Sequence, residues 1–146
     1  MSECVSCAAA PPDTLRSLLF AFATVIIHSI FDTSHDDPQV NNTSSYLDLS
    51  PVYGNNEAQL AQIRTKKDGL LFPDAICDRR MALMTPATTS LAILFSRQHN
   101  YIATQLKQID EGQIVSSFTD EAKRDDYLFG TARLVNCASF AQIILR

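Results

Sequence analysis

The stretch Leu18–Phe31, which reads LLFAFATVIIHSIF, constrains the fold of this chain more than any other part of the sequence. A helix formed by these residues is apolar on all sides, which is typical of a helix buried in a protein core. His28 is its one strongly polar side chain, and an imidazole is costly to bury unless it is hydrogen-bonded, bound to a metal or used in catalysis. The pattern alone leaves these three interpretations of His28 open.

Small side chains precede His28 on its face of this predicted helix. Ala21, Thr24 and Val25 stand seven, four and three residues before it and therefore lie on the same side. A leucine or phenylalanine at these positions would fill the space next to the imidazole. We therefore expect room for a flat group beside His28.

The composition indicates one globular domain. The chain has 146 residues, of which 46% are hydrophobic and 19% are charged, and this excludes general disorder. A net charge of -4 without a run of Lys and Arg argues against nucleic acid and acidic membrane surfaces as partners. The longest apolar run is too short to cross a bilayer, and the N-terminus lacks the basic region of a secretory signal. We therefore expect no transmembrane segment and no secretion, and a location in the cytoplasm or at the surface of an intracellular membrane.

Capping residues and turn signals set the expected element boundaries, and few glycines and no tryptophan favour helices. After a flexible leader of residues 1–12, they predict a mainly α protein with long ordered loops. The expected elements are a helix that Asp13 or Thr14 caps, a short helix over Glu57–Ile63, a tight turn over Lys67–Leu70, a long helix from Thr85-Pro86 to about Asp110, and a last helix that starts at Thr119.

The two later helices carry apolar stripes that predict which faces are buried. The stripe of the long helix contains His99, which is either a hydrogen-bonded core residue or a functional one. The last helix is still apolar in its final turn, so we expect a piece of a longer protein or an oligomer that hides this surface. The expected stripes are Leu91, Phe95, Ile102, Leu106 and Ile109 in the long helix, and Leu128, Thr131, Val135, Ala138 and Gln142 in the last one.

Three polar segments offer metal ligands, and each also has a simpler interpretation. Cys4 and Cys7 have the spacing of a zinc or redox half-site, but no second half follows, which favours free thiols. The acids and the histidine in Asp32–Asp37 are typical of a solvated loop. The oxygen-rich stretch Asn41–Gly54 could bind a hard cation, although it is not an EF-hand.

Three stretches of the chain occur in the order and spacing of a known superfamily. They read FATVIIHSIFDTSHDD, NNTSSYLDLSPVYGNNEAQLAQIRTKKDGLLFPD and LAILFSRQHNYIATQLKQID. SSYLDLSPVYG followed by RTKKDG is specific, and FSRQHN matches an Arg-x-His-Asn helix. From about residue 14 to its end, the chain resembles the animal-type haem peroxidases and cyclooxygenases, and most closely their fungal fatty-acid dioxygenases, the linoleate diol synthases and psi-factor-producing oxygenases.

This resemblance implies haem as a cofactor and assigns roles near it. His28 stands where the family has its distal histidine, which moves the proton of a peroxide during O–O cleavage. Thr24 stands where cyclooxygenases have an assisting glutamine, and Arg80 lies near the place of a distal arginine, at inexact spacing. His28, Ala21 and Val25 would border the haem.

The resemblance also implies a calcium loop. Its ligands would be Ser44, the carbonyl of Tyr46, Asp48 and Ser50. Ser29 stands where the peroxidases and most fungal relatives have an aspartate that also binds calcium. The loss of this carboxylate weakens the expected site, because the number of charged ligands sets calcium affinity.

The family's iron-ligating proximal histidine and radical-forming tyrosine belong to a Tyr-Arg-Trp-His segment that is absent from this sequence, and neither His35 nor His99 matches these places. The resemblance therefore implies that residues 13–146 are a partial haem peroxidase domain, truncated at the C-terminus. Its relatives use peroxide to oxygenate a polyunsaturated fatty acid such as linoleate to an oxylipin, and we expect this chain to be inactive alone. The alternative is a non-catalytic helical module that binds a partner chain.

Overall fold

The computed structural model describes residues 12–44 and 46–145, and helices dominate these ranges. Two isolated antiparallel bridges, Thr33–Asn41 and Arg64–Leu71, are the extended pairings within them. The mainly α fold that the sequence predicts is confirmed. The elements are α1 (Pro12–Ile30), α2 (Ser50–Tyr53), α3 (Glu57–Ile63), the 3-10 helix η1 (Arg79–Leu83), α4 (Pro86–Ile109), the 3-10 helix η2 (Glu111–Gln113), α5 (Ile114–Ser117) and α6 (Glu121–Ile144).

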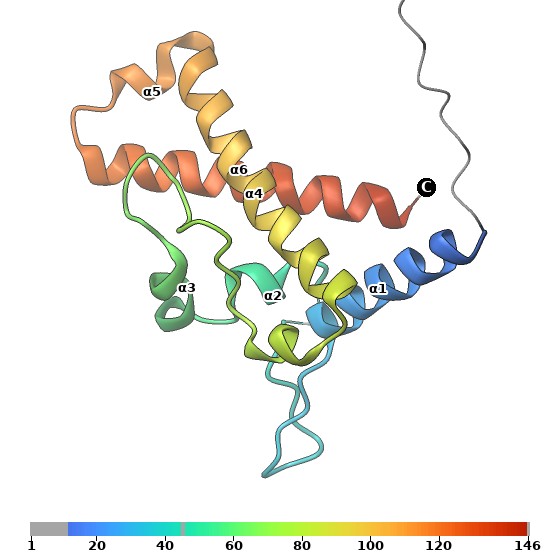
Figure 1. Ribbon diagram of the computed structural model, residues 1–146. Helices are drawn as coiled ribbons and strands as arrows, with labels where there is room; N and C mark the ends of the chain where they lie inside the picture. Colours follow the sequence, from blue (N-terminus) through green and yellow to red (C-terminus); the bar gives the residue numbers. More distant parts are fainter. Residues whose placement is uncertain (1–11, 45, 146) are drawn as a thin grey trace, which may run out of the picture.

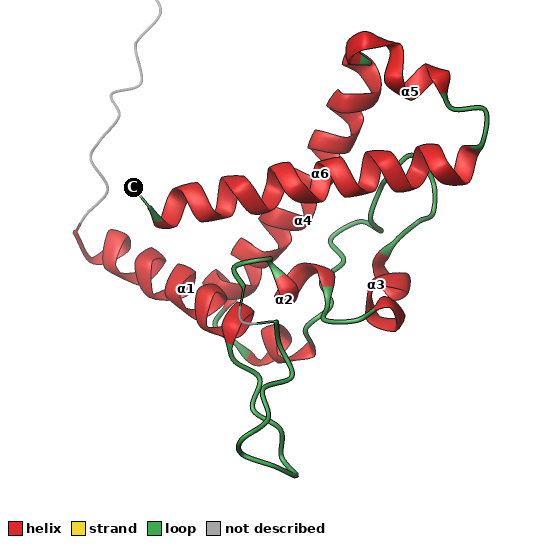
Figure 2. Cartoon of the chain, turned by 180° about the vertical axis from the view of Figure 1, so that it is seen from behind, coloured by secondary structure: helices red, strands yellow, loops and turns green. Residues whose placement is uncertain are grey.

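The long helices α4 and α6 cross, and α1 lies against the N-terminal half of α4 (Figure 1). The view from behind shows the C-terminal end of α6 on the same side as the N-terminal part of α1 (Figure 2). The loop over residues 31–42 projects away from the helices, and α3 lies on the side opposite to α1 (Figure 1). No helix of the described residues is long and apolar enough to cross a membrane.

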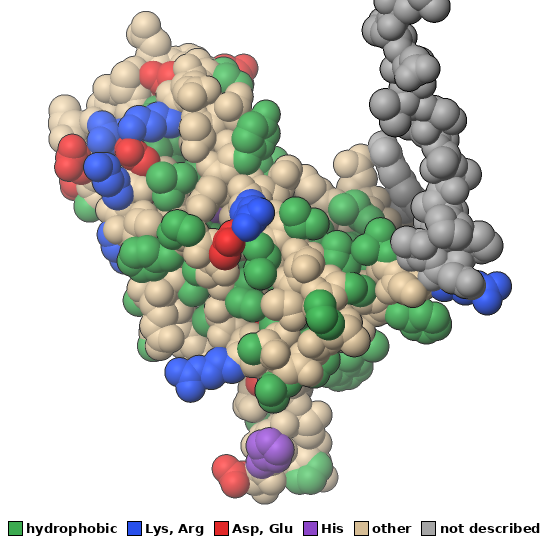
Figure 3. Space-filling view, viewed as in Figure 1, with side chains coloured by type: hydrophobic (Ala, Val, Ile, Leu, Met, Phe, Trp, Pro, Cys, Tyr) green, Lys and Arg blue, Asp and Glu red, His purple; other side chains and the backbone are tan. Residues whose placement is uncertain are grey.

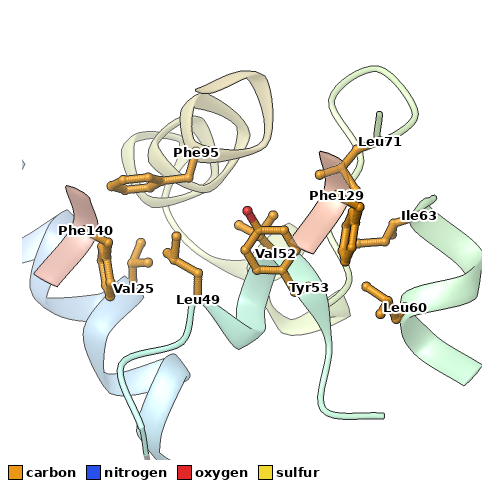
Figure 4. Packing of buried hydrophobic residues seen from close by; sticks show 10 residues of the cluster. All are labelled: Val25, Leu49, Val52, Tyr53, Leu60, Ile63, Leu71, Phe95, Phe129 and Phe140. Atoms are coloured by element: carbon orange, nitrogen blue, oxygen red, sulfur yellow. The ribbon is translucent and has the colours of Figure 1, made fainter. Parts of the chain in front are cut away.

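Short elements between the long helices supply much of the core (Figure 4). Leu49 and Tyr53, at the two ends of α2, are fully buried, and Val25 of α1 lies beside Leu49. The rings of Phe95 and Phe140 meet edge to face at a centroid distance of 5.2 Å, which joins α4 to α6. One continuous core therefore connects α1, α2, α4 and α6.

A chain of buried hydrogen bonds runs through this core. The His99 Nε2 atom lies 2.8 Å from the Gly69 carbonyl oxygen, which only accepts, so Nε2 carries the proton. Burial lowers the pKa of His99, so the ring is neutral and its Nδ1 accepts from the Tyr53 hydroxyl at 2.9 Å. The Asn136 amide donates to that hydroxyl oxygen at 2.8 Å and to the Phe95 carbonyl at 2.9 Å. The interpretation of His99 as a hydrogen-bonded core residue is confirmed.

The turn after α3 is fixed against the side of α6. Gly69 has a φ of +70°, and a Cβ atom there would lie 2.6 Å from the backbone nitrogen of Phe129. The Gly69 N–H donates to the Asp125 carboxylate at 2.6 Å, and the same carboxylate pairs with the buried Arg64. The turn expected over Lys67–Leu70 is confirmed by the bond from the Leu70 N–H to the Lys67 carbonyl at 3.1 Å.

Most predicted helix boundaries are confirmed. α3 spans the predicted residues, α4 begins at Pro86, and Asp120 caps α6 by accepting from the Ala122 N–H at 2.9 Å. The first helix begins at Pro12, so Asp13 and Thr14 lie inside it rather than at its cap. The Cys4–Cys7 pair lies outside the described residues.

The predicted burial of α1 and α6 needs correction. The stretch Leu18–Phe31 is not buried on all sides: the Phe20 side chain is 72% exposed, and α1 covers the core with one face only. In α6, Val135, Ala138 and Gln142 are exposed, contrary to the predicted stripe. The buried face of α6 instead includes polar residues whose side chains are hydrogen-bonded to other elements. A search for apolar residues at helical spacing cannot identify such positions. This face consists of Asp125, Leu128, Phe129, Ala132, Asn136 and Phe140.

The stripe of α4 is largely confirmed. Phe95, His99 and Ile102 are buried, and Leu91 and Leu106 are half-buried. Ile109 lies in the last turn and is 68% exposed, because α6 crosses α4 before that turn.

Candidate functional site

His28 lies in the last turn of α1, next to the 3-10 helix η1. Its side chain is 16% exposed, and its Nδ1 atom lies 3.7 Å from a carboxylate oxygen of Asp78. The same Nδ1 atom is buried and has no hydrogen-bond partner among the described residues. A buried ring nitrogen without a partner is unusual in a core, which makes His28 a candidate functional residue.

Arg80 joins η1 to the end of α1. Its guanidinium pairs with Asp78 at 2.7 Å and with Asp32 at 2.9 Å. It also donates to the backbone carbonyls of Phe31 at 3.0 Å and His28 at 3.4 Å. The structure therefore brings together His28 and Arg80, which the sequence analysis assigned to one site although 52 residues separate them.

Asp78 holds this cluster together, and the sequence analysis missed it. The Asp78 carboxylate caps η1 by accepting from the Arg80 backbone N–H at 2.8 Å. The same carboxylate accepts from the Arg80 side chain, whose Nε lies 3.0 Å away. The Asp-x-Arg pattern before η1 could have indicated the cap. It gave no sign that α1 would bring His28 to the same place.

The charges of the cluster favour a neutral imidazole. Burial lowers the pKa of His28, and the Arg80 guanidinium lowers it further, while Asp78 and Asp32 act in the opposite direction. The hydrogen bond from Arg80 to Asp78 raises the pKa of Arg80, so this side chain stays charged. A neutral imidazole beside a carboxylate can accept a proton and return it.

A polar hollow of about 400 Å³ opens beside these residues. It gives Asp78 and Arg80 access to solvent from the side of α3. The lining residues are Asp32, Ser50, Gly54, Asn55, Gln59, Gln62, Cys77, Asp78, Arg79 and Arg80.

The other three residues expected beside His28 do not share this cluster. Ala21 and Val25 are buried, and Val25 packs in the core with Leu49 and Phe140 rather than beside an open space (Figure 4). The Thr24 hydroxyl donates to the Phe20 carbonyl at 2.9 Å, one turn earlier in α1. The roles of these residues toward a cofactor stay predictions.

The predicted calcium loop lies against the end of α1. The Asp48 carboxylate accepts from the Ser44 hydroxyl at 2.8 Å and from the Ser50 N–H at 3.1 Å. The Ser50 hydroxyl donates to the Ser29 carbonyl at 3.1 Å, and the Tyr46 carbonyl accepts from the Asp48 N–H at 2.9 Å. The loop residues are thus close to the residue that follows His28.

The chemistry of this donor set fits a divalent cation poorly. Asp48 is its one carboxylate, and both oxygens of Asp48 are used inside the loop. The Ser29 hydroxyl is buried and donates to the Val25 carbonyl at 2.9 Å. No group of three or more His, Cys, Asp or Glu residues in the described part of the chain could hold a metal ion. We therefore derive no role for calcium, which stays a prediction.

An apolar hollow of about 570 Å³ lies between α1, α4 and the C-terminal part of α6. It is separate from the His28 cluster and shares no residue with the polar hollow. The lining residues are Leu18, Leu19, Phe22, Leu91, Leu94, Phe95, Gln98, Ser139 and Ile143.

Comparison with known proteins places the chain in a family. The model of the animal haem peroxidase family matches residues 13–81 and 75–146. The chain is 45% identical over 139 residues to 7,8-linoleate diol synthase of Pyricularia oryzae, 44% over 140 residues to Psi-producing oxygenase A of Emericella nidulans, and 43% over 144 residues to a bifunctional dioxygenase–epoxy alcohol synthase of Fusarium oxysporum. These matches cover 92% of the chain but only 12%, 13% and 11% of the respective relatives. No solved structure matches. The chain belongs to the animal haem peroxidase family.

Proposed function

We propose that this chain forms the peroxide-facing side of a haem-dependent fatty-acid dioxygenase site, in which His28 accepts and returns a proton. The cluster of His28, Asp78 and Arg80 carries this proposal, because α1 and η1 bring a neutral imidazole, a carboxylate and a guanidinium together. The relatives named for linoleate and for oxygenase activity support the reaction class.

The proposed roles follow from the contacts. His28 is neutral and partly exposed, so one ring nitrogen can take a proton from a peroxide O–H group and return it to the other oxygen. Asp78 favours the imidazolium that forms after the first transfer. Arg80 is a positioning residue, since its donors are already directed at Asp78, Asp32 and the backbone at the end of α1.

A bound haem would supply the iron-centred redox chemistry. Of the residues expected to border that group, His28 is partly exposed, whereas Ala21 and Val25 are buried. Neither of the other two histidines, both in the described part of the chain, is placed to bind the iron: His99 uses both ring nitrogens in the core, and His35 is exposed on the projecting loop over residues 31–42. We therefore infer that the chain alone binds haem weakly and has little or no activity.

The test is peroxide turnover by the 146-residue chain with haemin and free imidazole, which replaces the missing iron ligand. The Soret band reports haem binding, and oxidation of a phenolic dye reports turnover. His28→Ala is expected to lower turnover by about 10²–10⁴-fold without abolishing the Soret change. His35→Ala is the matched control and leaves turnover unchanged. Equal turnover in the His28→Ala variant and the unmodified chain would refute the proposed role.

One observation favours a second function, a module that binds a partner chain. Large apolar side chains are exposed on two helices, with Leu19 65% and Phe20 72% exposed on α1 and Leu134 73% exposed on α6. Light scattering after size exclusion measures association over a range of concentrations. Self-association that Phe20→Glu abolishes, together with no haem uptake, would favour this function over the first.

A further inference from the structure

Charged side chains from three separate segments surround a hollow of about 460 Å³ at the end of the molecule where α6 begins. Lys66, Lys67 and Asp68 come from the turn after α3, and Lys107 comes from the last turn of α4. The first turn of α6 adds further charges. The complete lining is Lys66, Lys67, Asp68, Lys107, Glu121 and Arg124. Figure 3 shows basic and acidic side chains gathered at this end, far from the apolar surface around α1.

The cations of this hollow exceed its acids. It has four basic and two acidic side chains, which leaves an excess of two positive charges in a chain whose net charge is -4. Asp68 is shared between Lys107 at 2.8 Å and Arg124 at 3.9 Å. The ammonium groups of Lys66 and Lys67 form no ion pair with any described residue. Two cations are therefore free to bind an anion.

The turn that carries these two lysines is rigid. Arg64, just before the turn, forms an ion pair with the buried Asp125, and the Gly69 N–H donates to the same carboxylate at 2.6 Å. The His99 ring donates to the Gly69 carbonyl at 2.8 Å. The Thr65 hydroxyl donates to the Leu70 carbonyl at 2.8 Å. Because the backbone of this turn is already fixed, it loses little conformational freedom when an anion binds, and the main ordering cost is that of the two exposed lysine side chains.

We propose that this hollow binds a phosphate dianion, either inorganic phosphate or the phosphomonoester group of a larger molecule. The excess of two positive charges matches the charge of such a group. Lysine ammonium groups are common ligands of phosphate oxygens, and Arg124 adds a planar guanidinium. The site shares no residue with the His28 cluster, so it is independent of the proposed dioxygenase function.

The direct test follows backbone amide shifts of the ¹⁵N-labelled chain by NMR during titration with inorganic phosphate at pH 7.5, with the ionic strength held by chloride. Saturable shifts are expected at Lys66–Gly69 and in the first turn of α6. The double variant Lys66→Gln/Lys67→Gln is expected to bind phosphate about tenfold more weakly or worse, because each lost charge removes one attraction at contact distance.

Two charge-matched controls separate a site from a general effect of charge. Lys123→Gln removes a cation from an exposed position of α6 outside the hollow and leaves the affinity unchanged. Asp68→Asn removes one negative charge from the hollow and tightens binding, whereas Asp36→Asn removes the same charge from the exposed loop and has no effect. The absence of saturable shifts, or an equal loss of affinity in the Lys123→Gln variant, would overturn the proposal.

A second arm distinguishes the source of the phosphate group. The chain is sedimented with phosphatidylcholine vesicles that contain or lack phosphatidic acid, a lipid with a phosphomonoester headgroup. Sedimentation with the acidic vesicles alone, lost in the double lysine variant, assigns the site to a lipid headgroup. Shifts with free phosphate and no sedimentation assign it to a soluble phosphate. No response to either form would refute the site.

Discussion

The buried hydrogen-bond chain around Tyr53 allows a stability change to be calculated from the structure. In Tyr53→Phe the ring still fills its place in the core, but the hydroxyl that donates to His99 Nδ1 is lost. His99 cannot compensate by moving its proton to Nδ1, because Nε2 would then face the Gly69 carbonyl without a hydrogen. Asn136 keeps its bond to the Phe95 carbonyl at 2.9 Å. One buried acceptor, His99 Nδ1, and one buried N–H of Asn136 are therefore left without a partner.

An unsatisfied buried polar group costs about 1–3 kcal/mol, so two such groups are expected to lower the free energy of unfolding of Tyr53→Phe by at least about 2 kcal/mol. A domain is stable by only about 5–15 kcal/mol, so this loss is large. With a urea m-value of about 2 kcal/mol/M, the unfolding midpoint would fall by roughly 1 M. Circular dichroism during urea titration measures it.

Tyr46→Phe is the matched control for this experiment. The Tyr46 side chain is 77% exposed, so the loss of its hydroxyl is expected to change the free energy of unfolding by less than about 0.5 kcal/mol. If both variants unfold at the same urea concentration, the hydroxyl of Tyr53 does not satisfy His99, and the assigned direction of the hydrogen bonds is wrong.

Two further predictions use the same assay. Gly69→Ala is expected to lower the free energy of unfolding by about 2 kcal/mol or more, because the φ of Gly69 is +70° and the new Cβ would meet the Phe129 backbone. Gly130→Ala, with open space around it in α6, is expected to raise the free energy of unfolding by about 0.5–1 kcal/mol. A change of the same sign in both variants would contradict this account. The pKa values of His28 and His99 are both lowered in the folded chain. Below a pH of about 6.5 the unfolded chain therefore binds more protons than the folded chain. The free energy of unfolding is expected to fall as the pH drops from there toward the folded pKa values. Unfolding midpoints that stay constant between pH 7.5 and 5.5 would refute the neutral, buried state of the two rings.

Local signals in the sequence predict the helix boundaries well. Thr85-Pro86 marks the start of α4, which begins at Pro86, and the start expected at Thr119 lies two residues before α6 begins at Glu121, with Asp120 as its cap. Burial is harder to predict, because it depends on which face meets a neighbour. Asp125 and Asn136 are polar, yet they lie on the buried face of α6 since partners on other elements satisfy them.

The candidate site was predicted only in part for the same reason. The resemblance assigned His28 and Arg80 to one site, and the structure places them together, but the resemblance did not give the carboxylate of Asp78. Asp78 reaches His28 through the packing of η1 against the end of α1, and no local pattern encodes that contact. The hollow proposed to bind phosphate could not be predicted from the sequence either. Lys67 and Lys107 lie far apart in the sequence and line one hollow only after α3, α4 and α6 have packed.

The position of Asn136 also determines how far α4 and α6 can slide along each other. Apolar side chains in a helix crossing tolerate many arrangements, and a slip of one helical turn, about 5.4 Å, can bury a similar area. The Asn136 side-chain NH2 group donates to the Phe95 carbonyl of α4 and to the Tyr53 hydroxyl of α2 at the same time. After a slip this amide would be buried without partners. We therefore expect Asn136 to favour a single alignment of the two helices, and an apolar replacement of similar size to permit several.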